Sequence, residues 1–321
     1  MRREKSYSSS FISLLIFLGI IIFLVHNISK FLSDELGQAQ TKVNVYNMHY
    51  ILDIQELLNS PNEALFNKLA STLEDQSFNE ITNEDFLNPL PSIWFFTQLM
   101  QETKASNNHN YQAASFINDL QQDDGLFTME KTPLGQGTEL RIDANLFSTK
   151  MAIDILQHYG EDIPKQELLH DVIHKELHNR LDEEKDVSLN GYLLLLLQIE
   201  EALHPQTDII EKARKVISTQ QIEDEIQKYS TDPVTVHELI EMAKILDENV
   251  KFDVDTIKEI EHSFNQLQMK NGAFSFEKSD QPSILATYYA VTVMNFLAID
   301  IHNKEGLLDY TNKLAKESFI K

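Results

Sequence analysis

Two kinds of apolar pattern alternate along the chain, and each predicts a different kind of helix. Towards the C-terminal end, Ile257, Ile260, Phe264 and Leu267 recur at the spacing i, i+3, i+7 and i+10, a one-sided stripe that indicates an amphipathic helix. Residues 284–297 are instead apolar on nearly every face of a helix. A helix of that kind is buried on all sides, so the pair predicts an outer helix packed over an inner one.

The same pairing recurs upstream. Residues 166–181 have a one-sided pattern, whereas residues 188–203 contain an unbroken run of five leucines. Residues 207–220 and 234–247 form a further pair. Helices are also predicted at residues 43–58, 62–73, 111–122, 143–159 and 303–321. Because the chain has only 9 Gly and 8 Pro and few alternating β-branched runs, it is predicted to be almost wholly helical.

A short motif is repeated between an outer and an inner helix. Residues 120–127 read LQQDDGLF and residues 267–274 read LQMKNGAF, so that Leu, Gln, Gly and Phe coincide. Both copies lead to a second helix with the pattern T-x-x-A, at residues 149–152 and 287–290. Internal similarity at long spacing is typical of repeated helical hairpins, each of which cannot bury its own face alone.

The positions that the two copies of this motif share have physical roles in a turn. Gly125 and Gly272 would allow a positive φ just after the end of a helix. The glutamine before each glycine can bridge backbone groups of the turn. Phe127 and Phe274 would then fill the layer between neighbouring hairpins.

The motif L-Q-x-x-[DN]-G-x-F, followed by a loop and a helix with T-x-x-A, resembles the repeat of terpenoid cyclases and protein prenyltransferase β subunits. The thioester-containing complement domains share that fold. The resemblance implies an all-α chain whose alternating inner and outer helices close into an α/α toroid, here of about five or six helical hairpins. An ordinary irregular α-helical domain is the alternative. Since one scaffold hosts many activities, the resemblance implies a fold and no single activity.

The N-terminal segment has a pattern of its own. Residues 6–29 carry no formal charge, and residues 11–25 are nearly all aliphatic or aromatic. About 20 apolar residues suffice to cross the hydrocarbon layer of a membrane. We therefore interpret residues 8–29 as an uncleaved transmembrane signal-anchor, with a cleaved signal peptide as the alternative.

The charges beside this segment predict its orientation. Arg2, Arg3 and Lys5 precede it, which places the N-terminus in the cytoplasm by the positive-inside rule. The predicted organisation is a cytoplasmic tail at residues 1–7, the anchor, a juxtamembrane linker at residues 30–40 and an extracytoplasmic toroid domain at residues 41–321. The predicted localisation is a bacterial cell membrane that the chain crosses once, with the C-terminal domain outside.

Composition excludes several classes of function. The 321 residues include no cysteine, which excludes disulfides, thiolate zinc sites and a cysteine nucleophile. Lys and Arg total 27 against 50 Asp and Glu, a formal net charge of −23. Such a charge disfavours nucleic acid and anionic lipid surfaces as partners.

The catalytic sets of the resembling families are incomplete in this chain. Class II terpene cyclases use an Asp in the motif D-x-D-D, but residues 253–256 read DVDT, and Asp255 is better explained as a helix N-cap. Prenyltransferase β subunits bind zinc through Asp, Cys and His, and the complement thioester needs Cys, which is absent. The magnesium motif DDxxD is also missing. Asp123 and Asp124 precede Gly125 and are predicted to serve the turn, with a weak calcium contact as the alternative.

Three histidines lie four residues apart on one predicted helix, at His170, His174 and His178. An i, i+4 pair of histidines can share a metal ion. All three together span about 12 Å at 1.5 Å per residue, too far for a single ion. Because no third ligand is evident in the sequence, we interpret them as the polar flank of an amphipathic helix.

The predicted binding surface lies where the inner helices begin. The resemblance places these helix heads at the ring cavity or its mouth, so Asp143, Asn145, Asp280 and Tyr288 are the predicted ligand-binding residues. Other aromatic side chains that can line such a cavity, or serve as core, are Trp94, Phe147 and Tyr289. No catalytic residue, metal ligand or cofactor is predicted.

These observations favour a membrane-anchored, extracytoplasmic toroid protein of the bacterial cell envelope that binds or assists another molecule without catalysis. Its partner would be an envelope protein, a peptide or a glycan, and no nucleic acid is expected. The alternative is a terpene cyclase-like or polysaccharide-processing enzyme that uses carboxylates in the ring cavity. Acidic side chains that converge in a deep aromatic-lined cavity would favour the enzyme.

Overall fold

Helices make up nearly all of the part of the chain that the structure describes. The structure is a computed structural model, and it describes residues 42–76, 89–106, 110–129, 142–181, 187–204, 208–278 and 281–320. The helices are α2 (Val45–Leu57), α3 (Glu63–Asp75), α5 (Pro89–Thr103), α6 (Asn110–Asn118), α7 (Ile142–Tyr159), α8 (Gln166–Leu181), α9 (Gly191–Leu203), α10 (Asp208–Val216), α11 (Thr219–Lys228), α12 (Pro233–Leu246), α13 (Val254–Leu267), α14 (Ile284–Phe296) and α15 (Lys304–Glu317). Two strands of two residues each, β1 (Lys42–Val43) and β2 (Phe319–Ile320), complete the described elements.

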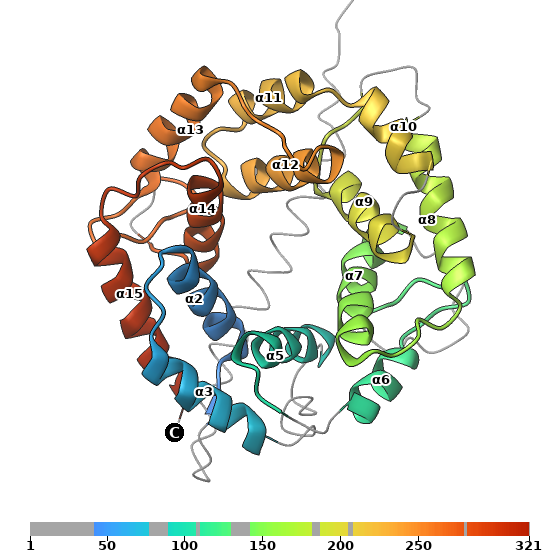
Figure 1. Cartoon of the computed structure of the whole chain (residues 1–321), viewed down its shortest axis with the longest axis horizontal. Helices are drawn as coiled ribbons and strands as arrows, with labels where there is room; N and C mark the ends of the chain where they lie inside the picture. The colour runs from blue at the N-terminus through green and yellow to red at the C-terminus, as the bar shows by residue number, and fades with distance from the viewer. Residues whose placement is uncertain are drawn as a thin grey trace, which may run out of the picture. The chain divides into compact units, whose positions relative to one another are not determined.

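Six of these helices form the inner layer of a closed ring within the unit Val43–Phe319 (Figure 1). Helix α2 packs against α5, α5 against α7, α7 against α9, α9 against α12, and α12 against α14. Helix α14 then packs against α2. Because the last contact returns to the first helix, the inner layer has no open edge.

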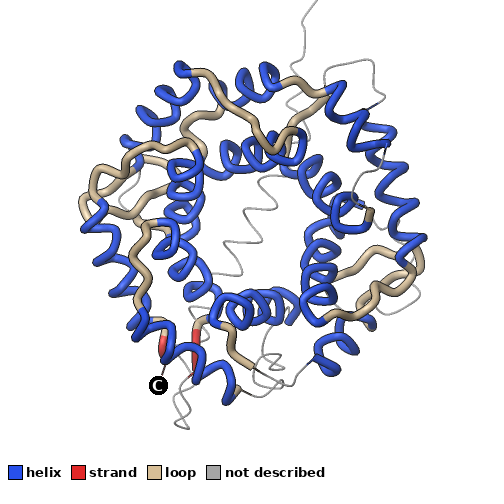
Figure 2. Tube along the Cα trace, viewed as in Figure 1, coloured by secondary structure: helices blue, strands red, loops and turns tan. Residues whose placement is uncertain are grey.

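The other helices lie outside this inner layer (Figure 2). Helix α3 packs on α5, α6 on α7, α8 on α9, α11 on α12, and α15 on α2. Helix α10 contacts α8, α9 and α12, and α13 packs against α11. An inner helix therefore has two inner neighbours and an outer layer behind it, which explains the apolar residues on nearly every face of α14.

The two ends of the unit complete one hairpin together. Helix α15, the last outer helix, packs on α2, the first inner helix. The Asn44 N–H donates to the Ser318 carbonyl at 2.9 Å, beside the paired strands β1 and β2. Gln55 on α2 also donates through Nε2 to Asn312 Oδ1 on α15 at 3.2 Å. The ring is thus closed by hydrogen bonds between residues far apart in sequence.

The predicted all-α toroid is confirmed, and its six inner helices agree with the five or six hairpins expected. The predicted helix at 166–181 coincides with α8. The single helix predicted at 207–220 is wrong, because α10 ends at Val216 and α11 begins at Thr219. Ser218 causes the break, since its side chain and that of Gln221 form a capping box that starts a new helix.

The repeated glycine turn has the same hydrogen bonds in both copies. Gly125 and Gly272 have φ of 89° and 82°, in the left-handed region that was predicted for them. Gln121 donates through Nε2 to the Gly125 carbonyl at 3.0 Å, and Gln268 donates in the same way to the Gly272 carbonyl at 3.0 Å. The predicted bridging role of the glutamine is therefore confirmed.

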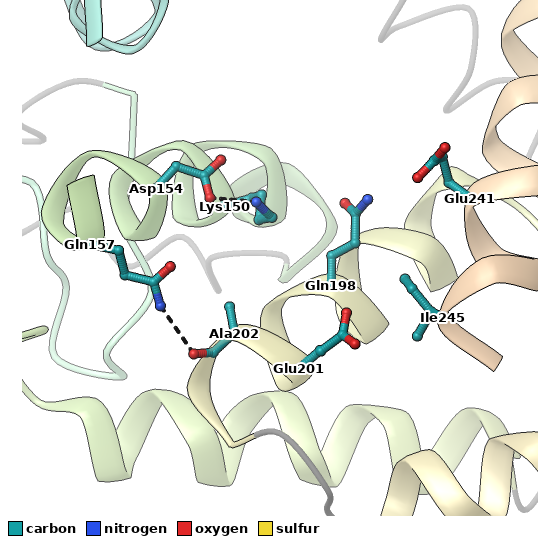
Figure 3. Close-up of a pocket in the computed structure, with 8 residues that line it drawn as sticks. All are labelled: Lys150, Asp154, Gln157, Gln198, Glu201, Ala202, Glu241 and Ile245. Atoms are coloured by element: carbon teal, nitrogen blue, oxygen red, sulfur yellow. Dashed lines mark hydrogen bonds and ion pairs between the residues drawn. The ribbon is translucent and has the colours of Figure 1, made fainter. Parts of the chain in front are cut away.

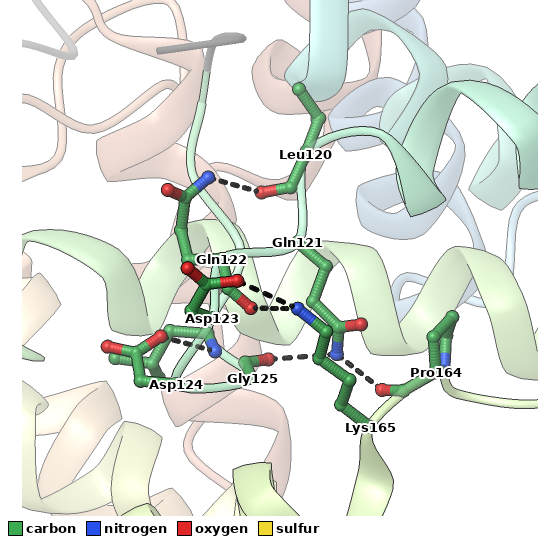
Figure 4. A network of polar contacts seen from close by, with 9 residues as sticks. Leu120, Gln121, Gln122, Asp123, Asp124, Gly125, Pro164 and Lys165 are labelled. Carbon is green, nitrogen blue, oxygen red and sulfur yellow. Dashed lines mark hydrogen bonds and ion pairs between the residues drawn. The ribbon is translucent and has the colours of Figure 1, made fainter. Parts of the chain in front are cut away.

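Figure 4 shows how the first copy also holds the next outer helix. Gln121 Nε2 donates to the Pro164 carbonyl as well, and Lys165 Nζ donates to the Gln122 carbonyl at 3.0 Å. Asp124 Oδ1 accepts from the Leu126 N–H at 3.0 Å, and Lys165 Nζ lies 3.4 Å from Asp123 Oδ1. The acidic pair thus serves the turn, as predicted.

The T-x-x-A pattern of each inner helix anchors this turn. The Phe127 N–H donates to Thr149 Oγ1 at 3.0 Å, and the Phe274 N–H donates to Thr287 Oγ1 at 2.9 Å. Both phenylalanines and both threonines are fully buried, so water cannot replace these bonds. The alanine of the pattern is also fully buried in both copies, which lets the turn approach the inner helix closely.

The predicted localisation as a single-pass membrane protein is contradicted. Within the described ranges, no helix combines the length and the apolar character needed to cross a membrane. The most uniformly apolar helix, α14, has 13 residues and is about 20 Å long, whereas a hydrocarbon core is about 30 Å thick. The predicted anchor at 8–29, its flanks at 1–7 and 30–40, and the first residue of the predicted domain lie outside the described residues.

Replacing Gly272 by alanine is expected to destabilise the ring by more than the same change at Gly160. Both glycines have a positive φ, but a Cβ at Gly272 would overlap with the Leu307 backbone nitrogen at the start of α15, whereas nothing lies within 4 Å of a Cβ at Gly160. Gly160→Ala should therefore lower the free energy of unfolding by about 1 kcal/mol, the conformational cost alone. Gly272→Ala should lower it by about 3 kcal/mol. Urea unfolding measures both, and equal losses would contradict the turn packing described here.

A second prediction concerns the threonine that anchors the turn. Thr287→Val keeps the shape of the side chain but leaves the buried Phe274 N–H without its acceptor. The free energy of unfolding should fall by about 1–3 kcal/mol. Thr103→Val is the matched control, because the hydroxyl of this buried threonine donates to the Leu99 carbonyl of its own helix and its loss leaves no N–H unpaired. A loss of stability as large in the control as in Thr287→Val would refute the assignment.

Candidate functional site

A belt of aromatic and ionisable side chains runs around the inner layer of the ring. On α2, α7, α9 and α12 they follow the spacing i, i+3 or i+4, which keeps them on one side of the helix. On α5 and α14 they include a pair of adjacent aromatic residues. The belt consists of Tyr46, His49, Tyr50 and Asp53 on α2, Trp94, Phe95 and Glu102 on α5, Lys150 and Asp154 on α7, Gln198 and Glu201 on α9, His237 and Glu241 on α12, and Tyr288 and Tyr289 on α14. Most of these side chains are half-buried, so they keep contact with solvent while lying between helices.

The polar centre of the belt is a histidine between two carboxyl groups. His49 Nδ1 lies 2.8 Å from Glu102 Oε1, and His49 Nε2 lies 3.7 Å from Asp53 Oδ2. One ligating atom from each of the three residues lies within 4.8 Å of the other two. Since Glu102 is on α5 and the other two are on α2, this trio joins two neighbouring inner helices.

Aromatic rings surround the trio on the side of α5 and α14. The His49 ring is 5.7 Å from Trp94 and 5.5 Å from Phe95, measured between centroids. Tyr50 is 5.1 Å from His49 and 4.9 Å from Tyr288, which brings α14 into the same cluster. We name the trio and these four rings the aromatic–acid cluster.

Burial among these rings shifts the pKa values of all three groups of the trio towards their uncharged forms. Burial raises the pKa of Glu102 from 4.5 to about 8, with a smaller contribution from the nearby Glu56. Burial likewise raises the pKa of Asp53 from 3.8 to about 7, although His49 opposes the shift. The pKa of His49 is lowered, again chiefly by burial. A protonated Glu102 can then donate its hydrogen to the neutral ring of His49.

The belt continues from the cluster onto α7 through the only tryptophan of the chain. Trp94 Nε1 donates to Asp154 Oδ2 at 3.1 Å. Asp154 in turn pairs with Lys150 at 2.5 Å, which neutralises its charge. Figure 3 shows Asp154 and Lys150 at one side of a pocket of about 300 Å³, with Gln198 and Glu201 of α9 and Glu241 of α12 at the other sides.

On α12 the belt turns back towards α14. The ring of His237 lies 4.9 Å from Tyr289 and 6.2 Å from Tyr288. Its Nε2 lies 3.9 Å from Glu241 Oε1, and that carboxylate pairs with Lys244 at 2.7 Å. Burial lowers the pKa of His237 to about 4, so its ring is neutral at neutral pH. This part of the belt therefore also carries little net charge.

The structure places the four predicted binding residues in different surroundings. Tyr288 lies in the aromatic–acid cluster. Asn145 is buried in the first turns of α7, where its Nδ2 has no hydrogen-bond partner among the described residues. Asp143 is in α7, but its side chain is not among the parts that the structure describes. Asp280 lies outside the described residues. Their role in ligand binding stays a prediction.

The carboxylates of residues 253–256 belong to an outer helix and not to the belt. Asp253 is the N-cap of α13, with its Oδ1 accepting from the Thr256 N–H at 2.6 Å. The predicted cap at Asp255 is wrong, because Asp255 lies in the first turn with its side chain 92% exposed. An exposed carboxylate on the outer layer has no access to the belt.

His49, Asp53, Glu102 and His237 were not singled out from the sequence. One signal was available, since His49 and Asp53 are an i, i+4 polar pair inside an otherwise apolar helix. Their partner Glu102 is 53 residues away from His49, and only the packing of α2 on α5 brings it near. The trio offers one imidazole and two carboxyl groups, donors that suit a divalent cation. A cation would first have to displace the protons that burial holds on those carboxyl groups.

With this geometry in hand, the chain was compared with known proteins. It matches the family model described as the prenyltransferase alpha-alpha toroid domain over residues 68–187 and 213–320. These two ranges cover well over half of the chain and contain both copies of the glycine turn. A search of the curated proteins gives no match.

Glu102 of the aromatic–acid cluster is expected to make stability fall as pH rises from about 4.5 to about 8. Glu102 keeps its proton up to about pH 8 in the folded chain, whereas an unfolded chain releases it near pH 4.5. The folded state binds more protons in this window, so the free energy of unfolding decreases there by at most about 1.4 kcal/mol per pH unit for this group. The lowered pKa values of His49 and His237 act in the opposite direction, but only below about pH 6.5.

Urea unfolding of wild type and Glu102→Gln at pH 6.5 and pH 8 checks this expectation. The variant should lose less stability than wild type between these two values. Glu305→Gln, at an exposed position on α15, is the control and should follow wild type. Parallel behaviour of wild type and Glu102→Gln would show that Glu102 is ionised in the folded chain throughout this range.

Proposed function

The chain belongs to the prenyltransferase alpha-alpha toroid family, and from this premise we propose that it is a non-catalytic binding module. Its ligand is an uncharged, polyhydroxylated molecule such as a glycan segment, held on the belt. The observation that carries this proposal is the aromatic–acid cluster, in which partly exposed rings stand next to carboxyl groups whose pKa values burial raises to about 7 and about 8.

The aromatic rings supply flat apolar surfaces of the kind that sugars use. Trp94, Phe95 and Tyr288 are neither fully buried nor fully exposed, so each keeps some contact with solvent. The apolar C–H faces of a sugar can pack on such rings, which combine large contact area with few degrees of freedom.

The polar groups of the belt suit hydroxyl groups and not ions. Protonated Asp53 and Glu102 can each donate one hydrogen bond and accept others. Asp154 is paired with Lys150, and Glu241 with Lys244, so neither presents an uncompensated charge. The formal net charge of −23 disfavours an anionic ligand further. An uncharged ligand with many hydroxyl groups fits this balance best.

The catalytic sets of related proteins do not fit the residues of this chain. Without cysteine, the Asp, Cys and His set through which prenyltransferase β subunits bind zinc is absent. Hydrolysis of a glycoside by two carboxyl groups needs them about 5–9.5 Å apart. One oxygen of Asp53 and one of Glu102 lie within 4.8 Å of each other, which is shorter than that range.

A second candidate function is supported by the pKa values of the same cluster. An enzyme needs a general acid or base that titrates near its working pH, and Asp53 and Glu102 titrate at about 7 and about 8 beside His49. Such an enzyme would transfer a proton between Glu102 or Asp53 and a substrate on the aromatic rings. Product formation distinguishes this candidate from a binding module.

Trp94 provides a direct test, because it is the only tryptophan and lies in the cluster. Full-length protein is titrated with neutral oligosaccharides of different linkage while the tryptophan emission is recorded. We expect a saturable change for at least one linkage. Phe95→Ala should weaken binding about tenfold, equal to about 1.4 kcal/mol, because Phe95 packs against both Trp94 and His49.

Tyr229→Ala is the matched control, since this exposed tyrosine at the C-cap of α11 contacts Lys228 outside the belt. It should leave the affinity unchanged. A response to charged ligands alone, or no response to any oligosaccharide, would refute the proposal. Mass spectrometry of the mixtures tests the second candidate. Product that forms with wild type but not with Glu102→Gln, at unchanged affinity, would favour the enzyme over the binding module.

A further inference from the structure

A second cluster of histidines and a carboxylate lies between α8 of the outer layer and α9 of the inner layer. We propose that His170, His174 and Glu200 in this cluster bind a zinc ion that ties the two helices together. The proposal rests on residues outside the belt and does not depend on the function proposed for the belt.

The donor atoms have the spacing of a zinc coordination sphere. Glu200 Oε1 lies 3.3 Å from His170 Nε2 and 3.1 Å from His174 Nδ1. One ligating atom of each residue lies within 4.8 Å of the other two. Metal–ligand bonds of 2.0–2.1 Å in a tetrahedron place neighbouring ligand atoms about 3.3–3.4 Å apart. The two contacts to Glu200 are therefore close to two edges of such a tetrahedron.

Two buried polar atoms in the cluster lack a partner. Glu200 is fully buried, and its Oε2 has no hydrogen-bond partner among the described residues. The ring of His204 lies 4.2 Å from that of His170, and its buried Nε2 is likewise without a partner in the described part of the chain. Buried carboxylate and imidazole groups are nearly always bonded. A cation bound in this cluster would supply a partner of the kind that these groups lack.

The donor set favours zinc over the cations that prefer oxygen. Two imidazole nitrogens and a carboxylate are ligands for zinc and other transition metals, whereas calcium and magnesium take oxygen ligands. The side chains of His170 and His174 are 21% and 28% exposed, which gives an ion a route from solvent. Three protein ligands leave a fourth position for a water molecule.

The sequence contained only half of this site. His170 and His174 are an i, i+4 pair on α8. No metal was predicted for them, because no third ligand is evident in the sequence. That ligand comes from α9, where Glu200 and His204 have the same spacing of four residues. The packing of α8 on α9 brings the two pairs together. His178 lies one turn beyond His174 on α8 and is not part of the site.

The test uses full-length protein purified without a histidine tag and stripped of metal by a chelator. Zinc chloride is titrated calorimetrically, and we expect one zinc ion per chain and a thermal midpoint that rises with zinc concentration. His174→Ala and His170→Ala should each weaken zinc binding strongly. The loss should exceed the roughly 10- to 100-fold that follows removal of a residue that only hydrogen-bonds a metal ligand. Each variant should also lose the zinc-dependent rise in midpoint.

His262→Ala is the matched control, since this exposed histidine on α13 contacts Gln266 away from the cluster; it should bind zinc as wild type does. Cobalt chloride gives a second measurement that needs no variant. Intense visible absorption from four-coordinate cobalt in wild type supports the site, and the weak absorption of six-coordinate cobalt overturns it. Unchanged zinc affinity in both ligand variants, or no binding by wild type, would likewise overturn it.

Discussion

The hydrogen bond from a turn phenylalanine to an inner-helix threonine is the interaction on which the architecture of the ring depends. A two-layer ring has to bring its chain from the outer layer to the inner one through the core, where backbone N–H groups cannot reach water. In both clear repeats the glycine permits the turn, the glutamine bonds the glycine carbonyl, and the threonine accepts the phenylalanine N–H. The turn is thereby fixed to the helix that follows it, and the phenylalanine ring fills the space between hairpins.

This turn also explains how much of the fold could be predicted from the sequence. Its glycine, glutamine and phenylalanine lie within eight residues, and the stripes of α13 and α14 are periodic over one helix each, so both signals are local. The break between α10 and α11 was not predicted, because apolar residues continue on both sides of it and only the capping box of Ser218 starts a new helix. The cap of α13 was displaced by two residues for a similar reason, since Asp253 and Asp255 are both good caps and only the backbone geometry separates them.

The candidate site could not be derived in the same way, because its residues meet only across helices. Tyr288 was singled out from its place on an inner helix, but the other members of the aromatic–acid cluster come from α2 and α5. A histidine and a carboxyl group that are far apart in sequence carry no common periodic signal. Their protonation depends on burial by several helices at once, a property of the closed ring and not of any segment.

The closure of the ring through α2 and α15 has a consequence for how the chain is made. During synthesis on the ribosome, α2 emerges early, while both α14 and α15, which cover it, emerge among the last elements of the unit. Until those two helices are made, they cannot cover the apolar side chains of α2, among them Met48, Ile51 and Ile54, which are buried in the folded chain. Because only α5 among its neighbours in the ring is made early, α2 stays partly uncovered through most of translation, which makes it a natural point of contact for chaperones.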